Sequence, residues 1–289
     1  MTQAPARYQP LGAVGRVARK SVDGPNSLFE SLGHQATFVY QVLTAIPHTL
    51  RVYRRQTLLI LSDITWGSGA IIVGGGTVAV LVFLGIAVGG SIGVEGFTAL
   101  NMVGMGPLTG FVSAYANTRE MVPMVVAIGF AAQAGCRMTA EIGAMRISEE
   151  IDALEAIGIR PMSFVVTTRV IAGVVTIVPL HLLTLILSYL SCATVVNVLH
   201  GQSSGTYYHY FDAFLQPGDV LASLVKATVF VVVIILIHGY QGFYASGGPE
   251  GVGRASGRAI RASLVGVVIL DMIMTIAFWG LDVGIRISG

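Results

Sequence analysis

Four ionisable side chains lie in or at the edge of segments that are otherwise apolar: Arg119, Glu120, Lys226 and Asp271. A charge at the centre of a membrane helix costs about 2.5 to 3.5 kcal/mol on insertion scales, so each should face a partner or a wet cavity rather than lipid. Two are basic and two are acidic. Mutual neutralisation inside a helix bundle is therefore one interpretation, and we favour it for Lys226 and Asp271. A polar binding site is the other.

Arg119 and Glu120 are adjacent, so on a helix they point about 100° apart and cannot both face one cavity squarely. Arg keeps its charge in an apolar site and offers a planar fork suited to carboxylate or phosphate, whereas a buried Glu can protonate. We expect Arg119 to hold an anionic group, and Glu120 to orient it or to pair with a neighbouring helix. Pro123 cannot donate to the carbonyl of Arg119, which predicts a kink beside the pair.

A strongly charged stretch, RISEEIDALEAIGIRP, runs from Arg146 to Pro161 between very hydrophobic segments. It predicts one short helix at about 147–158 along a membrane surface, with Ser148 as its N-cap and with Gly158 and Pro161 ending it. Acidic residues gain nothing from anionic lipid and would suit a basic protein partner. The residues expected to contact that partner are Glu149, Glu150, Asp152, Leu154 and Glu155. A solvated charged loop is the alternative.

The composition is that of a polytopic all-α membrane protein. Of 289 residues, 54% are hydrophobic and 11% are charged, whereas soluble domains carry about 25% charged residues. Charge-free runs predict five spans, at about 64–93, 104–136, 170–197, 220–243 and 262–281. A turn is expected near 95–103, followed by one long helix broken at Pro107 and Pro123. Two separate short spans there would be the competing topology.

Arginine bias predicts the sidedness. The segments around Arg137 to Arg169 and the loop from Arg254 to Arg261 are rich in arginine, while 197–219 contains no Lys or Arg. Cytoplasmic loops carry the excess of basic residues. We therefore expect a plasma (inner) membrane protein with its N-terminus in the cytoplasm and its C-terminus outside. A net charge of +2 is too small to indicate nucleic-acid binding.

The first sixty residues differ from the rest, which suggests a division into 1–60 and a five-span domain at 61–289. Met1 to Ser27 has no signal-peptide pattern and is expected to be a loose tail. Leu28 to Gln56 has helical periodicity with basic residues off the apolar face, which predicts an interfacial helix. A helix packed on a cytoplasmic partner is the alternative.

Motifs for catalysis and metal binding are lacking in the sequence. The glycine-rich segments lack the GK[ST] ending of a P-loop, and neither HExxH nor GxSxG occurs. Cys136 and Cys192 lie in apolar segments without paired spacing, which favours neither a disulfide nor a metal site. We expect no cofactor, no metal and no ATP hydrolysis by this chain.

The stretch RMTAEIGAMRISEEIDALEAIGIRPMSFVVTTR, Arg137 to Arg169, resembles the signature of the MlaE/YrbE family, the permeases of ABC-type lipid transporters that work with MCE (mammalian cell entry) proteins. The likeness runs from about Tyr53 to the end and is greatest to actinobacterial YrbE proteins of the B type. It implies that the acidic segment is a coupling helix that docks on a separate ATPase. It also implies that Arg119 and Glu120 line a central lipid cavity, and that an A-type paralogue completes a heterodimer.

The resulting hypothesis is a permease subunit that moves a lipid or fatty-acid-like substrate between extracytoplasmic MCE proteins and the inner membrane, in the direction of import. Two alternatives remain. One is an intramembrane lipid-modifying enzyme, and the other is a non-transporting membrane anchor for MCE proteins.

Overall fold

The computed structural model describes residues 13–67 and 76–280, which form helices and short connections without a strand. Contacts divide the chain into two compact units, Met1–Thr44 and Ala45–Gly289. The described part of the first unit is helical throughout, as part of α1 (Ala13–Val52). Helix formation thus begins at Ala13, and the prediction of a loose tail to Ser27 was wrong for Ala13–Ser27. Residues 1–12 lie outside the described residues.

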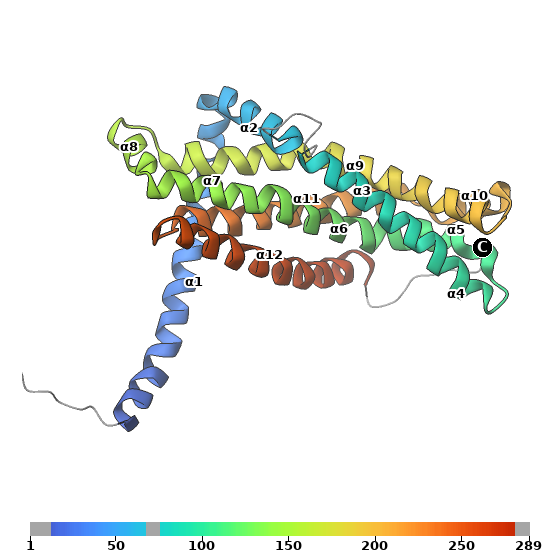
Figure 1. Cartoon of the computed structure of the whole chain (residues 1–289), viewed down its shortest axis with the longest axis horizontal. Coiled ribbons are helices and arrows are strands. Elements are labelled where there is room, and N and C mark those ends of the chain that lie inside the picture. The colour runs from blue at the N-terminus through green and yellow to red at the C-terminus, as the bar shows by residue number, and fades with distance from the viewer. Residues whose placement is uncertain (1–12, 68–75, 281–289) are drawn as a thin grey trace, which may run out of the picture. The chain divides into compact units, whose positions relative to one another are not determined.

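The second unit holds the remaining helices (Figure 1). They are α2 (Arg54–Trp66), α3 (Gly76–Ser91), α4 (Phe97–Asn101), α5 (Thr109–Val112), α6 (Val122–Phe130), α7 (Cys136–Ile147), α8 (Glu150–Ala156), α9 (Thr168–Thr194), α10 (Ser204–Phe214), α11 (Pro217–Phe243) and α12 (Gly248–Trp279), joined in places by π-helical and 3-10 segments.

Five helical segments in the described residues are long and apolar enough to cross a membrane, as predicted. They are Gly76–Asn101, Gly106–Ile147, Met162–Leu199, Pro217–Phe243 and Gly248–Trp279. The shortest has 26 residues, against the roughly 20 needed to span. Several boundaries differ from prediction. The second helical segment continues to Ile147 rather than to about 136, the third begins at Met162 rather than at about 170, and the fifth begins at Gly248 rather than at about 262. Ile64 belongs to α2, and the turn after the first span lies at 102–105; residues 68–75 lie outside the described part.

The second span is one continuous helical segment rather than two short spans. Pro107 stands in the first turn of a 3-10 helix at Gly106–Leu108, so it begins the span instead of breaking it. Pro123 follows a π-helical segment, Ser113–Met121, in which the Val122 N–H reaches back five residues to the Asn117 carbonyl. The irregularity expected at Pro123 is therefore a local change of helical register.

Small residues let α3 and α9 approach closely. A Cβ at Gly85 would lie 2.8 Å from the Thr184 carbonyl oxygen, and one at Gly89 would lie 2.0 Å from that of Ser188. Neither backbone atom can move away without shifting its helix. These glycines are needed for helix contact, which is their usual role in membrane helices.

Replacing Gly89 with alanine is expected to destabilise the bundle by about 1 to 3 kcal/mol, because the methyl group would overlap the α9 backbone. Gly90 provides the matched control, since a Cβ there meets only the Ser191 hydroxyl at 3.4 Å. Gly90→Ala should be neutral or slightly stabilising, because alanine is the better helix former. Thermal unfolding of both purified variants in detergent measures the difference, and equal melting temperatures would contradict the prediction.

Within the second unit, the end of α1 rests on the start of the third span. The Thr49 hydroxyl donates to the Ser163 carbonyl at 3.4 Å, and the Tyr53 ring packs edge-on against Phe164 with ring centres 5.4 Å apart. Tyr53 interrupts the helix between α1 and α2. The predicted helix at 28–56 is therefore the second half of one helix and the start of another.

Candidate functional site

Three helical segments contribute a charged cluster, named here the central cluster and made of Arg119, Glu120, Asp219, Lys226 and Asp271. The spacing along each segment explains how the side chains meet. Asp219 and Lys226 are seven residues apart on α11, which is two helical turns, and Asp271, Thr275 and Trp279 follow at intervals of four along α12. Each helix thus presents a stripe of polar or aromatic side chains to the π-helical segment that carries Arg119 and Glu120.

Arg119 is held by Asp219 of α11. Its Nη2 and Nε atoms donate to Asp219 Oδ2 at 2.8 and 3.1 Å, and Trp279 Nε1 donates to Oδ1 of the same carboxylate at 2.7 Å. The guanidinium also lies over the rings of Tyr115 and Trp279, 4.2 and 5.0 Å from their centres. The anionic group in the fork of Arg119 is therefore a side chain of this chain. The sequence prediction did not include Asp219, although its seven-residue spacing from Lys226 was a usable signal.

Lys226 is completely buried and contacts both predicted acidic residues. Its Nζ lies 2.7 Å from Asp271 Oδ1 and 3.2 Å from Glu120 Oε2. It also donates to the Arg119 carbonyl at 2.8 Å. In a regular α-helix the backbone N–H of residue 123 would donate to this carbonyl, but Pro123 has no N–H. Lys226 and Asp271 thus form an ion pair, and Glu120 pairs with a neighbouring helix while Arg119 faces another partner.

The acidic segment differs from its prediction in its N-terminal half. Ser148 caps the end of α7, where its hydroxyl donates to the Ala144 carbonyl at 2.9 Å. The same hydroxyl contacts the Glu150 carboxylate at 2.9 Å, and the N-cap residue of α8 is Glu149. Glu149 has a left-handed backbone with φ of 61° and precedes the helix. The helix α8 is therefore shorter than predicted, because α7 continues through Ile147 and the chain must turn before α8 begins. Gly158, with φ of 81°, follows its C-terminal end.

The residues predicted to contact a partner lie at the surface of the protein, apart from one half-buried leucine. Glu149, Glu150, Asp152 and Glu155 are exposed, and Leu154 is half-buried. Asp152 accepts from Arg146 at 2.7 Å. The apolar side is only partly covered: Ile151 is buried, whereas the side chain of Ile157 is 72% exposed. The segment therefore offers both acidic and apolar surface.

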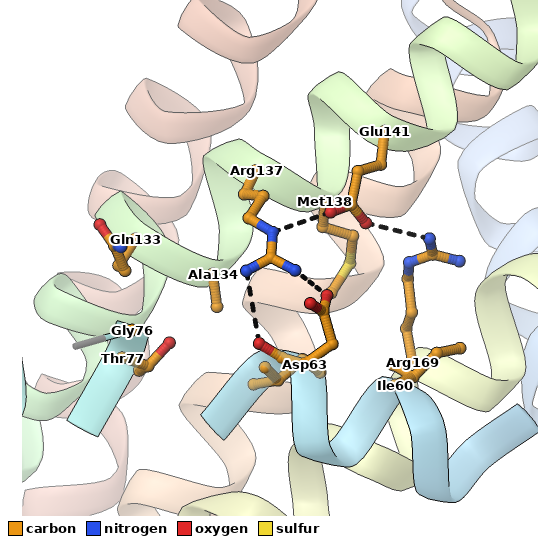
Figure 2. A pocket seen from close by; sticks show the side chains of 11 residues that line it. Ile60, Asp63, Gly76, Thr77, Gln133, Ala134, Arg137, Met138, Glu141 and Arg169 are labelled. Carbon is orange, nitrogen blue, oxygen red and sulfur yellow. Dashed lines mark hydrogen bonds and ion pairs between the residues drawn. The ribbon is translucent and has the colours of Figure 1, made fainter. Parts of the chain in front are cut away.

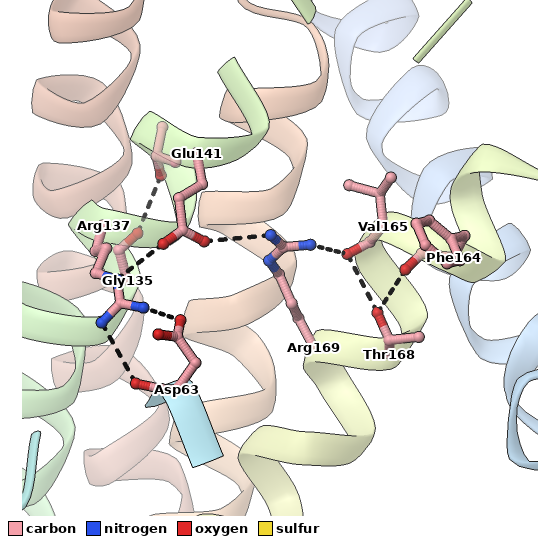
Figure 3. A network of polar contacts seen from close by, with 9 residues as sticks. Asp63, Gly135, Arg137, Glu141, Phe164, Val165, Thr168 and Arg169 are labelled. Carbon is pink, nitrogen blue, oxygen red and sulfur yellow. Dashed lines mark hydrogen bonds and ion pairs between the residues drawn. The ribbon is translucent and has the colours of Figure 1, made fainter. Parts of the chain in front are cut away.

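A second charged group, named here the inner cluster, consists of Asp63, Arg137, Glu141 and Arg169 (Figure 3). Arg137 pairs with Asp63 and donates to Glu141 Oε1 at 2.8 Å. Arg169 donates to the other oxygen of Glu141 at 3.2 Å. Glu141 thus joins α7 to α9, and Arg137 joins α7 to α2.

The inner cluster borders a cavity of about 30 Å³, which has room for one or two water molecules (Figure 2). Thr77 and Gln133 also line it. The sequence prediction used Arg137 and Arg169 only as markers of sidedness. The four-residue spacing of Arg137 and Glu141 could have indicated their pairing on one helix, but the contacts with Asp63 and Arg169 join distant parts of the chain.

Replacing Glu141 with alanine is expected to destabilise the protein by about 1 to 3 kcal/mol. Arg169 is only 11% exposed in its side chain and would lose its carboxylate, whereas Glu141 itself is 40% exposed, which weakens the effect. Glu250 is the control, since its pair with Arg254 lies on the surface. Glu250→Ala should change thermal stability little, and an equal loss in both variants would contradict the role of Glu141.

The comparisons with known proteins agree with one another. Residues 68–277 match the family described as Permease MlaE. A protein of Arabidopsis thaliana, TRIGALACTOSYLDIACYLGLYCEROL 1, chloroplastic, is 31% identical over 186 residues, covering 64% of this chain and 52% of that protein. A probable ABC transporter permease protein of Rickettsia prowazekii is 32% identical over 171 residues, covering 56% and 62%.

A third relative, the intermembrane phospholipid transport system permease protein MlaE of Haemophilus influenzae, is 29% identical over 203 residues, covering 70% of this chain and 77% of that protein. The chain thus spans between about half and two thirds of the first two relatives. The matched residues contain all five candidate spans apart from the last two residues of the fifth, together with the acidic segment and the central cluster.

Proposed function

The chain belongs to the MlaE permease family, and we propose that it is a non-catalytic permease subunit of an ATP-driven lipid transporter. One observation carries the proposal. The continuous helical segment Gly106–Ile147 holds Arg119 and Glu120 in the central cluster and leads, through one turn, into the exposed acidic helix α8. A partner that moves α8 would therefore move the helix that carries the charged site.

The proposed partner at α8 is a cytoplasmic ABC ATPase with a basic docking surface. The acidic residues are exposed and the side chain of Ile157 is open, so charge and apolar contact are both available. The inner cluster supports this coupling because α7, which ends beside α8, is tied to α2 and α9 by Arg137 and Glu141.

The outer partners are proposed to be MCE proteins, and the second half of the transporter an A-type permease paralogue. α10 is rich in Tyr and Phe, lies at the end of the bundle opposite α8 (Figure 1), and exposes Tyr208. This end has no Lys or Arg between 197 and 219, which favours the extracytoplasmic side. Import from MCE proteins to the inner membrane is the proposed direction.

The proposed substrate is a lipid with an anionic headgroup that contacts Arg119. The Arg119 side chain is 15% exposed and Glu120 is 35% exposed, so both remain reachable from the surface of this chain. A phosphate would compete with Asp219 for the guanidinium fork, because both anions suit the same planar donor set. Asp219 would then hold Arg119 in place when no lipid is bound.

The test is co-purification of the chain with its ATPase, followed by measurement of nucleotide turnover and identification of the bound lipid. A transporter is expected to show turnover that depends on this subunit and to retain a phospholipid or another anionic lipid. Turnover that is the same without this subunit would favour a membrane anchor. Conversion of the bound lipid into a product without an ATPase would favour a lipid-modifying enzyme.

The proposed orientation predicts which single cysteines are accessible from outside the cell. Gly205 of α10 and Gly253 of α12 are both exposed, so either position accepts a cysteine in a background without Cys136 and Cys192. Cysteine at 205 should react with an impermeant reagent added to intact cells, and cysteine at 253 should react only after the membrane is opened. The reverse pattern would invert the proposed topology.

A further inference from the structure

The central cluster has an imbalance of charge. Arg119 and Lys226 supply two positive charges, whereas Asp219, Glu120 and Asp271 supply three negative charges when ionised. Asp219 is fully occupied by Arg119 and Trp279. The excess negative charge therefore falls on Glu120 and Asp271, which share the single ammonium group of Lys226. An uncompensated charge in an apolar bundle is costly.

No other ionisable group in the described residues balances this charge. Tyr115 and Tyr189 lie nearby, and a phenol group supplies no positive charge. His181 of α9 reaches α11 through the Ser223 hydroxyl at 3.0 Å and forms no ion pair within the described ranges. Within the described part of this chain, the excess charge is left to the two carboxyl groups themselves.

The hydrogen bonds of Lys226 leave one carboxylate oxygen of Asp271 without a donor. An ammonium group has three N–H donors, and they point to the Arg119 carbonyl at 2.8 Å, the Thr275 hydroxyl at 2.9 Å and Glu120 Oε2 at 3.2 Å. Asp271 Oδ1 is 2.7 Å from the same nitrogen but accepts no hydrogen bond from any described residue, and Asp271 is only 6% exposed. A buried carboxylate oxygen without a donor is unfavourable.

We propose that Glu120 and Asp271 bind one proton between them, which makes this pair a proton-binding site within the membrane. Both carboxyl groups lie against one ammonium group, with Glu120 Oε2 at 3.2 Å and Asp271 Oδ1 at 2.7 Å from Lys226 Nζ. Carboxylates only accept hydrogen bonds, so a bond between them requires a proton on one of the two. One proton removes the excess charge and supplies a hydrogen-bond donor between the two carboxyl groups. Two carboxyl groups that share a site commonly retain one proton for the same electrostatic reason.

The consequence for transport rests on the proposed function. Release of the proton would leave both Glu120 and Asp271 negatively charged, and Glu120 is the residue next to Arg119. An anionic headgroup at Arg119 would then be repelled, so lipid binding should weaken as the pair loses its proton at higher pH. The titration belongs to the pair rather than to either residue.

The proton itself can be tested without any transport assay, by infrared spectroscopy of the full chain in lipid nanodiscs at neutral pH. A protonated carboxyl group has a C=O stretching band that is separate from the carboxylate bands and shifts in deuterated water. The wild-type protein should show this band. In E120Q, and equally in D271N, it should disappear, because the one remaining carboxylate is neutralised by Lys226 and needs no proton.

Each substitution is close in shape to the protonated side chain and leaves the cluster neutral, so both variants should fold; thermal unfolding checks this. E250Q removes an exposed carboxylate and should leave the band unchanged. Absence of the band in the wild type, or its persistence at full intensity in either variant, would overturn the proposal. If the band behaves as expected but no lipid is transported at any pH, the proton site stands and the proposed function fails.

Discussion

Replacing Arg119 with alanine is expected to abolish lipid transport, with a loss of about 100-fold or more, while the complex still assembles. Hydrogen bonds to charged groups contribute about 1.5 to 3 kcal/mol each, and alanine removes both donors of the guanidinium fork together with its charge. Arg119→Lys should restore part of the activity, because it keeps the charge and loses the planar fork. The measurement is transfer of a fluorescent or radiolabelled anionic lipid by the reconstituted complex.

The ion pair with Asp219 requires a control, since alanine at 119 leaves a poorly exposed carboxylate without its partner. The double variant Arg119→Ala, Asp219→Asn removes that unpaired charge. It should assemble at least as well as Arg119→Ala and still fail to transport. Normal transport by Arg119→Ala would exclude a role in lipid binding. Failure of both variants to assemble would make Arg119 a structural member of the ion pair.

Reversing the charge of Glu149, Asp152 and Glu155 to lysine is expected to weaken association with the ATPase by about 100-fold, while membrane insertion is unchanged. All three side chains are exposed, and the contact of Asp152 with Arg146 lies at the surface, where an ion pair contributes at most about 1 kcal/mol. Lysine side chains facing a basic surface would repel it, so charge reversal should weaken binding more than neutralising the three acids would. Co-purification and nucleotide turnover measure the effect.

Reversal of Glu250 to lysine is the control for this experiment. Glu250 is exposed and lies in the first turn of α12, at the same end of the bundle as α8 (Figure 1), but it is not part of the acidic segment. The Glu250 variant should bind the ATPase normally. If the triple variant also binds it with normal turnover, the acidic segment is a solvated surface and the docking hypothesis is wrong.

The sequence by itself determined the class of protein and the number of spans. Crossing a bilayer requires a continuous apolar run, and that is a property of neighbouring residues. The end of the acidic helix near Gly158 was also predictable from neighbouring residues, since a left-handed backbone at the end of a helix favours glycine. The sequence motif around EEIDALE was also enough to indicate the family.

The start of α8 could not be predicted from local signals alone. Ser148 is as suitable for capping the end of α7 as for beginning α8, because its hydroxyl can bond to the preceding carbonyl groups. Which role it takes depends on how far α7 continues, and α7 is held by packing against α11 and α12. The same holds for the π-helical segment before Pro123, whose wider register brings Arg119 and Glu120 to different partners.

Only the tertiary structure decided which charges meet. Arg119 pairs with Asp219, one hundred residues away, and Glu141 joins Arg137 on its own helix to Arg169 on another. The sequence showed that buried charges need partners, since taking an ionised side chain out of water is costly. It could not assign them, because an ion pair depends on the rotation and height of each helix in the bundle, and these are set by close contacts such as that of Gly89 with the backbone of Ser188.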